Sequence, residues 1–295
     1  MKIRFVVDSA CDVPQALVQQ HQMTVIPAFV NYNGESHPDD GVTFDRERYY
    51  EQLPSLHPYP TTSAPSVGIA SEYLQTALND ADHVVAVSVG AKFSSIYNSY
   101  RLAAANYPTD KITLVDSGQL SMGGGWQAIL GAEIATSTGD LDATLRAIQS
   151  VRAHQKVWAA VQSLEFMYRG GRLNWAQAAI GNFLRIRPIV EVGENVIKPA
   201  AQARKQSVWV QTLANFIRSQ APLERLALLH SNNLTALDDL REQIVDIMPP
   251  HVLTLHATPS IGTHTGPQAI GAATVSASWR DAFNASASHP QRTPR

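Results

Sequence analysis

Cysteine and charged residues are scarce in this sequence. Cys11 is the single cysteine among 295 residues, which excludes an internal disulfide and a cysteine-based zinc site. Asp, Glu, Lys and Arg together make up 16% of the chain, against about 25% in typical soluble proteins. So few charges suit a large apolar interior or an apolar cavity, although ordinary variation in composition accounts for them nearly as well.

Long apolar runs and clusters of basic residues are also missing. The longest apolar stretches end well short of the roughly 18 residues that a membrane span requires, so no membrane span is expected. Lys and Arg are dispersed and the formal net charge is −2, which argues against a nucleic-acid-binding surface. Met1 leads directly into a strand pattern, so we expect no signal peptide. We therefore expect a cytoplasmic protein, and a monomer because no segment marks a self-association surface.

The first half of the chain alternates β-branched runs with helical patterns. This alternation is typical of βαβ units and a parallel sheet. The strands are predicted over residues 3–7, 25–30, 83–89 and 111–115.

The pattern changes from about residue 155, where a second α/β unit is predicted. Its strands are expected over residues 157–161, 186–192, 196–200, 226–230, 252–257 and 269–275, and its helices over residues 208–220 and 234–248. The predicted fold class is therefore α/β, with two α/β domains of which the first has a mainly parallel sheet. We assign residues 1–157 to the N-terminal domain, residues 158–278 to the C-terminal domain and residues 279–295 to a disordered tail rich in Ser, Pro and Arg.

Two segments rich in hydroxyl side chains lie between strands and helices, where α/β proteins build their ligand sites. The first contains Thr61, Thr62 and Ser63, before a helix that begins near residue 67. The second places Ser94 and Ser95 at the entrance to the next helix. Such hydroxyls either cap the helix or help its free N–H groups to bind an anion. Both interpretations remain open at this point.

Two further segments combine glycines with polar residues. Residues 116–125 end in three glycines, but no Gly-Lys-Ser/Thr follows, so a Walker A phosphate loop is excluded and close packing of a helix is favoured. Residues 261–267 place His264 between two glycines and beside two threonines, which predicts a ligand-binding loop. No second histidine lies two to four residues from His264. We therefore expect no metal site and no cofactor.

Two arginines accompany turn signals. Arg172 follows a pair of glycines, and Arg204 follows the strand predicted over residues 196–200. Most arginines are simply solvated, but an arginine beside a turn can present its planar guanidinium to a carboxylate or phosphate.

Taken in order, these segments resemble the DegV family of fatty-acid-binding proteins. The resemblance covers residues 1 to about 275. Two motifs are specific in combination: Thr-Thr-Ser-x-Pro-Ser at residues 61–66 and Gly-x-His-x-Gly-Pro at residues 262–267. The other matching residues are Asp8-Ser9, Lys92-Phe93-Ser94 with Tyr97 and Ser99, Asp116-Ser117, Gly170-Gly171-Arg172, Arg187-Pro188-Ile189 and Arg204.

The resemblance implies a long-chain fatty acid bound between the two domains. Its carboxylate would lie on hydroxyl and imidazole groups, contributed by Thr61, Thr62, Ser63, Ser94, Ser95 and His264. Members of the family serve as the carrier subunit of a bacterial fatty-acid kinase and have no catalytic machinery of their own. A separate ATP-binding subunit phosphorylates the carboxylate to an acyl-phosphate for phospholipid synthesis, and Arg172 and Arg204 match arginines that support this transfer.

The sequence departs from the family at three places, and two other functions remain open. Ser95-Ile96 stands where Gly-Thr is common, Gln268 replaces a usual glycine, and fewer basic residues follow Arg204. An acyl-transfer hydrolase could use Ser94 as nucleophile and His264 as base, although no Gly-x-Ser-x-Gly motif surrounds Ser94. The parallel sheet and the three glycines are also compatible with a nucleotide- or sugar-binding regulatory protein.

Overall fold

A four-stranded parallel sheet forms the N-terminal part of the protein. We describe a computed structural model that covers residues 1–42, 44–173 and 186–288. The strand order is β2-β1-β6-β7, and all three neighbouring pairs are parallel. Their bounds are β1 (Ile3–Asp8), β2 (Thr24–Ile26), β6 (His83–Ser88) and β7 (Ile112–Asp116). Every residue of β6 is buried, as expected for a central strand covered by helices on both faces.

A six-stranded mixed sheet forms the C-terminal part. Only β11 and β12 pair in parallel within it, and the other neighbours are antiparallel. In spatial order its strands are β10 (Val196–Ala203), β9 (Arg187–Gly193), β8 (Gln155–Ala160), β13 (Ile270–Ser276), β11 (Leu223–His230) and β12 (Val252–His256). The predicted α/β class, with a parallel first sheet, is confirmed.

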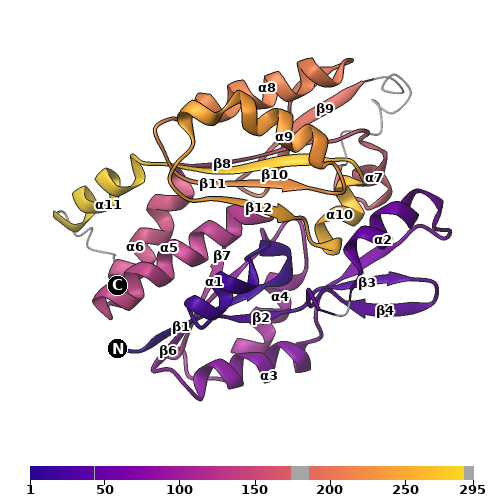
Figure 1. Cartoon of the computed structure of the whole chain (residues 1–295). Helices are drawn as coiled ribbons and strands as arrows, with labels where there is room; N and C mark the ends of the chain where they lie inside the picture. Colours follow the sequence, from indigo (N-terminus) through magenta and orange to yellow (C-terminus); the bar gives the residue numbers. More distant parts are fainter. Residues whose placement is uncertain (43, 174–185, 289–295) are drawn as a thin grey trace.

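Helices and sheets alternate in layers (Figure 1). Helices α3 (Val67–Leu78) and α4 (Ile96–Ala104) contact the four-stranded sheet, α5 (Met122–Thr138) and α6 (Leu141–Ala153) lie between the two sheets, and α8 (Gln206–Arg218) and α9 (Leu234–Gln243) cover the outer face of the six-stranded sheet. The short helices are η1 (Ser9–Cys11), α1 (Gln15–Gln20), η2 (Leu53–Ser55), α7 (Glu165–Arg169), η5 (Val245–Ile247) and α10 (Pro259–Thr265).

Helix α5 is the central packing element, and its glycines explain how it fits. It contacts β1 and β6 on one side and β8 and β13 on the other. A Cβ atom on Gly123 would lie 2.7 Å from a methyl group of Val157, and one on Gly124 would lie 2.9 Å from the Cys11 sulfur. The three glycines therefore allow close packing, as the sequence predicted.

A small antiparallel sheet and helix α2 form an arm beside the layers (Figure 1). The sheet has the order β4-β3-β5, with β3 (Phe29–Tyr32), β4 (Glu35–Pro38) and β5 (Thr61–Ser63), and α2 spans Arg46–Gln52. The single strand predicted over residues 25–30 was wrong, because the chain leaves the parallel sheet at Ile26 and enters the arm at Phe29. Pro27 lies at this break and has no N–H for a strand ladder.

The C-terminal end of the described chain is ordered, which corrects the predicted tail. Residues 279–288 form α11 (Trp279–Ser288), and Trp279 is only 1% exposed. Its indole N–H donates to Glu224 at 2.8 Å, and Ser150 donates to its carbonyl at 2.7 Å. Burial of Trp279 stabilises this helix and offsets the loss of conformational entropy on ordering. The polar composition of the segment gave no sign of this contribution. Residues 289–295 of the predicted tail lie outside the described residues.

The predicted domain boundary falls inside a strand. β8 begins at Gln155, so a boundary between residues 157 and 158 divides a strand that belongs wholly to the six-stranded sheet. The largest hydrophobic cluster also includes residues from both sheets, such as Val85 and Val190. The assigned domain ranges themselves stay predictions. Within the described ranges, no helix has the length and apolar character to cross a membrane.

Candidate functional site

A cavity lies against the inner face of the six-stranded sheet, beside the loops that follow β1, β6 and β7. Strand register explains its apolar wall, because side chains of directly opposed residues point to the same face. Val157 opposes Val192, which opposes Ile197, while Gly271 opposes both Ala159 and Leu229. All six residues line the cavity. The wall is therefore a sheet face that offers no side-chain hydrogen bonds.

Gly271 and Ala159 are the smallest residues of this apolar wall, and they form the floor of the cavity. They are cross-strand partners in the centre of the sheet, and larger residues such as Val192 and Leu229 flank them. The two small side chains leave a trough between the larger ones. Such a trough suits an extended apolar group.

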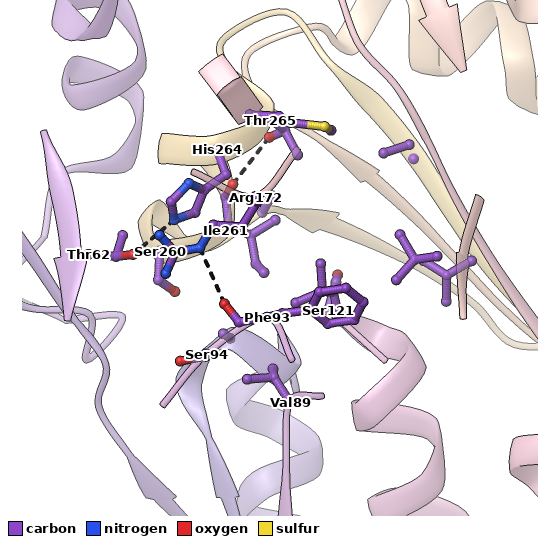
Figure 2. Close-up of a pocket in the computed structure, with 18 of the residues that line it drawn as sticks. Thr62, Val89, Phe93, Ser94, Ser121, Arg172, Ser260, Ile261, His264 and Thr265 are labelled. Atoms are coloured by element: carbon purple, nitrogen blue, oxygen red, sulfur yellow. Dashed lines mark hydrogen bonds between the residues drawn. The ribbon is translucent and has the colours of Figure 1, made fainter. Parts of the chain in front are cut away.

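One end of the cavity carries an imidazole–hydroxyl pair. His264 Nε2 and Thr62 Oγ1 lie 2.8 Å apart (Figure 2). His264 belongs to helix α10, so the predicted loop position was wrong. The sequence Thr258-Pro259 starts this helix, since proline is well suited to a first turn.

The His264 ring is held in a tight, poorly solvated position. A Cβ atom on Gly170 would lie 2.0 Å from Nδ1, so only glycine leaves room for the ring. Nδ1 is buried and has no hydrogen-bond partner among the described residues. Burial, reinforced by the nearby charge of Arg172, lowers the pKa of His264 to about 3. The imidazole is therefore neutral at physiological pH, with one N–H donor and one acceptor nitrogen.

Arg172 supplies the cation at this end. It is the single Lys or Arg among the residues that line the described cavity. Its Nε donates to the Phe93 carbonyl at 3.2 Å (Figure 2), and its Nη1 donates to the Gly170 carbonyl. These two bonds fix the guanidinium between the loop after β6 and the turn after α7. Burial lowers the pKa of Arg172 from its ordinary value, and the group remains a cation.

The predicted hydroxyl residues divide into capping and cavity-facing groups. Ser66 caps α3 by accepting from the Ile69 N–H at 3.2 Å, which leaves Thr62 and Ser63 to line the cavity. Ser94 and Ser95 line it too, at the start of α4. The Ser94 Oγ accepts from the Ile96 N–H at 3.3 Å.

Two of the predicted site residues do not line the cavity. Thr61 is exposed on β5, and Arg204 is exposed just after β10. The strand register nevertheless relates Arg204 to α10. Ala203, next to Arg204, opposes Arg187 at the start of β9, and Ala160 at the end of β8 opposes both Ile189 and Ile270. Arg204 therefore lies outside the cavity, at the end of the sheet to which α10 leads and where β13 begins.

Three tyrosines that the sequence prediction missed hold α10 in place. Tyr49 Oη lies 2.7 Å from Thr263 Oγ1, and Tyr59 donates to the Thr263 carbonyl. Tyr50 donates to the carbonyls of Ala257 and Thr258 at 2.9 and 3.0 Å. These residues lie more than 200 positions from α10, so no local motif marks them. Their aromatic character predicts only burial.

The contacts do not match those of a Ser/His hydrolase. Such an enzyme needs the histidine to bond the serine and a carboxylate to orient the imidazole. Among the described residues, His264 Nε2 bonds Thr62 and no serine, and its Nδ1 meets no carboxylate. Within the same residues no group of three His, Cys, Asp or Glu side chains is arranged to hold a metal ion.

Comparison with known proteins places the chain in a family. The profile described as "Uncharacterised protein, DegV family" matches residues 2–277. A DegV domain-containing protein of Caldanaerobacter subterraneus subsp. tengcongensis is 26% identical over 92% of this chain and 97% of its own. Protein DegV of Bacillus subtilis is 27% identical over 92% of this chain and 98% of its own.

Solved structures show the same fold. The structure of a DegV family protein from Thermus thermophilus, reported for its fatty acid binding, has a TM-score of 0.87 and 28% identity, and it covers 94% of this chain and 100% of its own. The fold of DegV from Bacillus subtilis matches with a TM-score of 0.82 at 24% identity, over 93% and 99%. The resemblance seen in the motifs is confirmed, and the chain belongs to the DegV family.

Proposed function

We propose that this protein binds a long-chain fatty acid, with the carboxylate at the His264 end of the cavity and the acyl tail along the trough. The observation that carries the proposal is the division of one cavity into two chemically different parts. Its wall is a sheet face of Val, Ile, Leu, Ala and Gly, and its end gathers Thr62, Ser94, His264 and Arg172.

The two parts match the two halves of a fatty acid. A buried methylene contributes about 0.8 kcal/mol, so the trough supplies affinity for the tail. A carboxylate buried without partners costs several kcal/mol, so the end must supply donors. The neutral His264, the Ser94 hydroxyl and the Arg172 guanidinium are suitable donors, and Ser63 and Ser95 add hydroxyls at the rim. Thr61 faces solvent, and we leave it out of the proposed carboxylate site.

The relatives support the same ligand class. The Thermus thermophilus protein, at 28% identity, is reported for fatty acid binding. Its fold covers almost the whole of this chain, so the elements that form the cavity here have counterparts there.

We further propose that the protein is a carrier. In this role it presents the bound carboxylate to a separate ATP-binding kinase subunit, which forms an acyl-phosphate for phospholipid synthesis. Arg172 would contact the carboxylate from inside, and Arg204 would act from the exposed end of β10. The absence of a His264–carboxylate pair among the described residues supports a carrier over a hydrolase.

Organic extraction and mass spectrometry test the central claim. Protein purified from a bacterial host should contain about one fatty acid per chain, and delipidated protein should take up palmitate or oleate. A lipid-free extract together with no uptake would refute fatty-acid binding. If wild type hydrolyses a model ester and Ser94→Ala does not, the protein is instead an acyl-transfer hydrolase.

A further inference from the structure

A polar strip interrupts the cavity wall next to the carboxylate end, and a plain acyl tail has no use for it. Ser260 lies on α10 one turn before His264, and both line the cavity (Figure 2). Ser121, at the start of α5, lines the cavity as well. The two serines belong to one hydrogen-bonded network.

Two buried carboxylates form the back of this network. Ser121 Oγ donates to Asp12, and the Thr258 N–H donates to the other oxygen of Asp12 at 2.8 Å. Ser260 donates to Asp39 through both its Oγ and its N–H. The Thr258 and Ser260 hydroxyl oxygens lie 3.3 Å apart and join the two halves. Asp12 and Asp39 are 6% and 1% exposed, so neither carboxylate forms the cavity surface.

The direction of these bonds determines what the strip offers to a ligand. A serine hydroxyl has one proton and two lone pairs. Ser121 and Ser260 each give their proton to a carboxylate behind the wall. Because its own proton is used, Ser260 accepts from the Thr258 hydroxyl and keeps one lone pair, whereas Ser121 keeps two. Toward the cavity both serines therefore present hydrogen-bond acceptors. Ser231 lies outside this network and bonds backbone groups alone, because it donates to the Gly266 carbonyl at 2.7 Å and accepts from the Ala269 N–H at 2.9 Å.

The backbone at Ser121 is also unusual. Ser121 has a φ of 53°, a left-handed conformation that favours glycine and is strained for serine. A side chain is retained there at a conformational cost.

We propose that the cavity selects an acyl chain with a hydroxyl group near its carboxylate, and that this hydroxyl donates to Ser260 Oγ. The inference rests on the proposed fatty-acid function and narrows its ligand class. Ser260 and His264 are four residues apart on one helix, so their side chains are about one turn, roughly 5.4 Å, from each other. With the carboxylate at His264, the hydroxyl then lies within the first few carbons, as in a 3-hydroxy fatty acid.

Competition between matched acids tests the proposal. Dissociation constants of palmitate and of both enantiomers of 3-hydroxypalmitate are measured at pH 8 for delipidated wild type, Ser260→Ala and Ser121→Ala. In an apolar cavity, an unpaired hydroxyl weakens binding by about tenfold or more. We expect one enantiomer to bind wild type at least as tightly as palmitate. In Ser260→Ala it should lose about tenfold relative to palmitate. Ser121→Ala should show a smaller loss of the same sign, because it acts through the network.

Ser231→Ala is the matched control, because that serine bonds backbone groups and is not part of the Asp12–Asp39 network. It should leave the ratio of the two dissociation constants unchanged. If wild type binds palmitate but rejects both 3-hydroxy enantiomers by tenfold, the inference is overturned while fatty-acid binding stands. The same holds if neither Ser260→Ala nor Ser121→Ala changes the ratio. If neither palmitate nor the hydroxy acid binds, the proposed function itself fails.

Discussion

The Oγ1 atom of Thr62 and the Nε2 atom of His264 lie 2.8 Å apart, although 202 residues separate them in the sequence. The contact joins β5 of the arm to helix α10 and brings together the two motifs that are most specific in the sequence. It also fixes the orientation of a neutral imidazole at the polar end of the cavity.

Replacing either partner should therefore weaken carboxylate binding selectively. We expect His264→Gln and Thr62→Val each to raise the dissociation constant of palmitate by about 10- to 100-fold, because a lost hydrogen bond to a charged group costs about 1.5–3 kcal/mol. Hexadecanol has no charge to lose, so its affinity should change much less. Isothermal titration of both ligands provides the comparison. Equal losses for acid and alcohol would assign the two residues to folding alone.

The pH dependence of stability gives a second prediction for His264. Burial and Arg172 lower the pKa of the folded-state imidazole to about 3, whereas an unfolded histidine titrates near 6.5. Below about pH 6.5 the unfolded state therefore binds a proton that the folded state does not. The stability that neutral His264 contributes should be present above pH 6.5 and be lost as the pH falls toward 3.

Thermal unfolding of ligand-free wild type and His264→Gln between pH 7 and pH 4 measures this effect. The Tm of wild type minus that of the variant should decrease as the pH falls. His256, whose pKa burial lowers to about 4, and Asp8, whose pKa burial raises to about 7, are present in both proteins. Their contributions cancel in the difference. Parallel Tm curves for the two proteins would contradict the assignment.

The floor of the trough leads to a third prediction. Gly271 opposes Ala159 and Leu229, which line the cavity, so the side chain of Gly271→Val enters the trough. Its Cβ atom would lie 3.0 Å from the Trp158 carbonyl, so the neighbouring strand must shift by a few tenths of an ångström. Excluding two methylenes costs about 1.6 kcal/mol, or about tenfold in affinity. Stearate should lose at least this much, and decanoate should lose little. An equal loss for both acids would place the tail elsewhere.

Local patterns predicted many of the strands and helices, but not how they assemble into the site. The β-branched runs of β1, β6 and β7 and the hydroxyl-rich entrances to α3 and α4 are local signals, and the structure agrees with them. Helix α10 was missed because Gly262 and Thr263, which lie within it, are poor helix formers. Tertiary contacts override that propensity, since Gly262 is needed where a Cβ atom would lie 1.9 Å from the Tyr50 hydroxyl. Asp12 and Asp39 were missed because they are far in sequence from Thr258 and Ser260, and only the fold brings these residues together.

The last prediction separates carrying a fatty acid from delivering it. Arg204 is exposed after β10 and outside the cavity, at the end of the sheet to which α10 leads. Phosphoryl transfer concentrates negative charge between the acyl oxygen and the γ-phosphate, and a positioned arginine can stabilise that charge. The Arg204→Ala variant should therefore bind palmitate as wild type does, and its Tm should be nearly unchanged. It should lose most acyl-phosphate formation when a compatible kinase subunit and ATP are supplied.

Two further variants make this test specific. Arg204→Lys should restore activity only in part, because lysine keeps the charge but lacks the planar guanidinium. Lys205→Ala is the matched control, since Lys205 is the adjacent exposed cation. It should leave acyl-phosphate formation close to that of wild type. Full activity of Arg204→Ala in the same assay would rule out the delivery role of Arg204 and leave fatty-acid binding untouched, because no residue of the cavity has been altered.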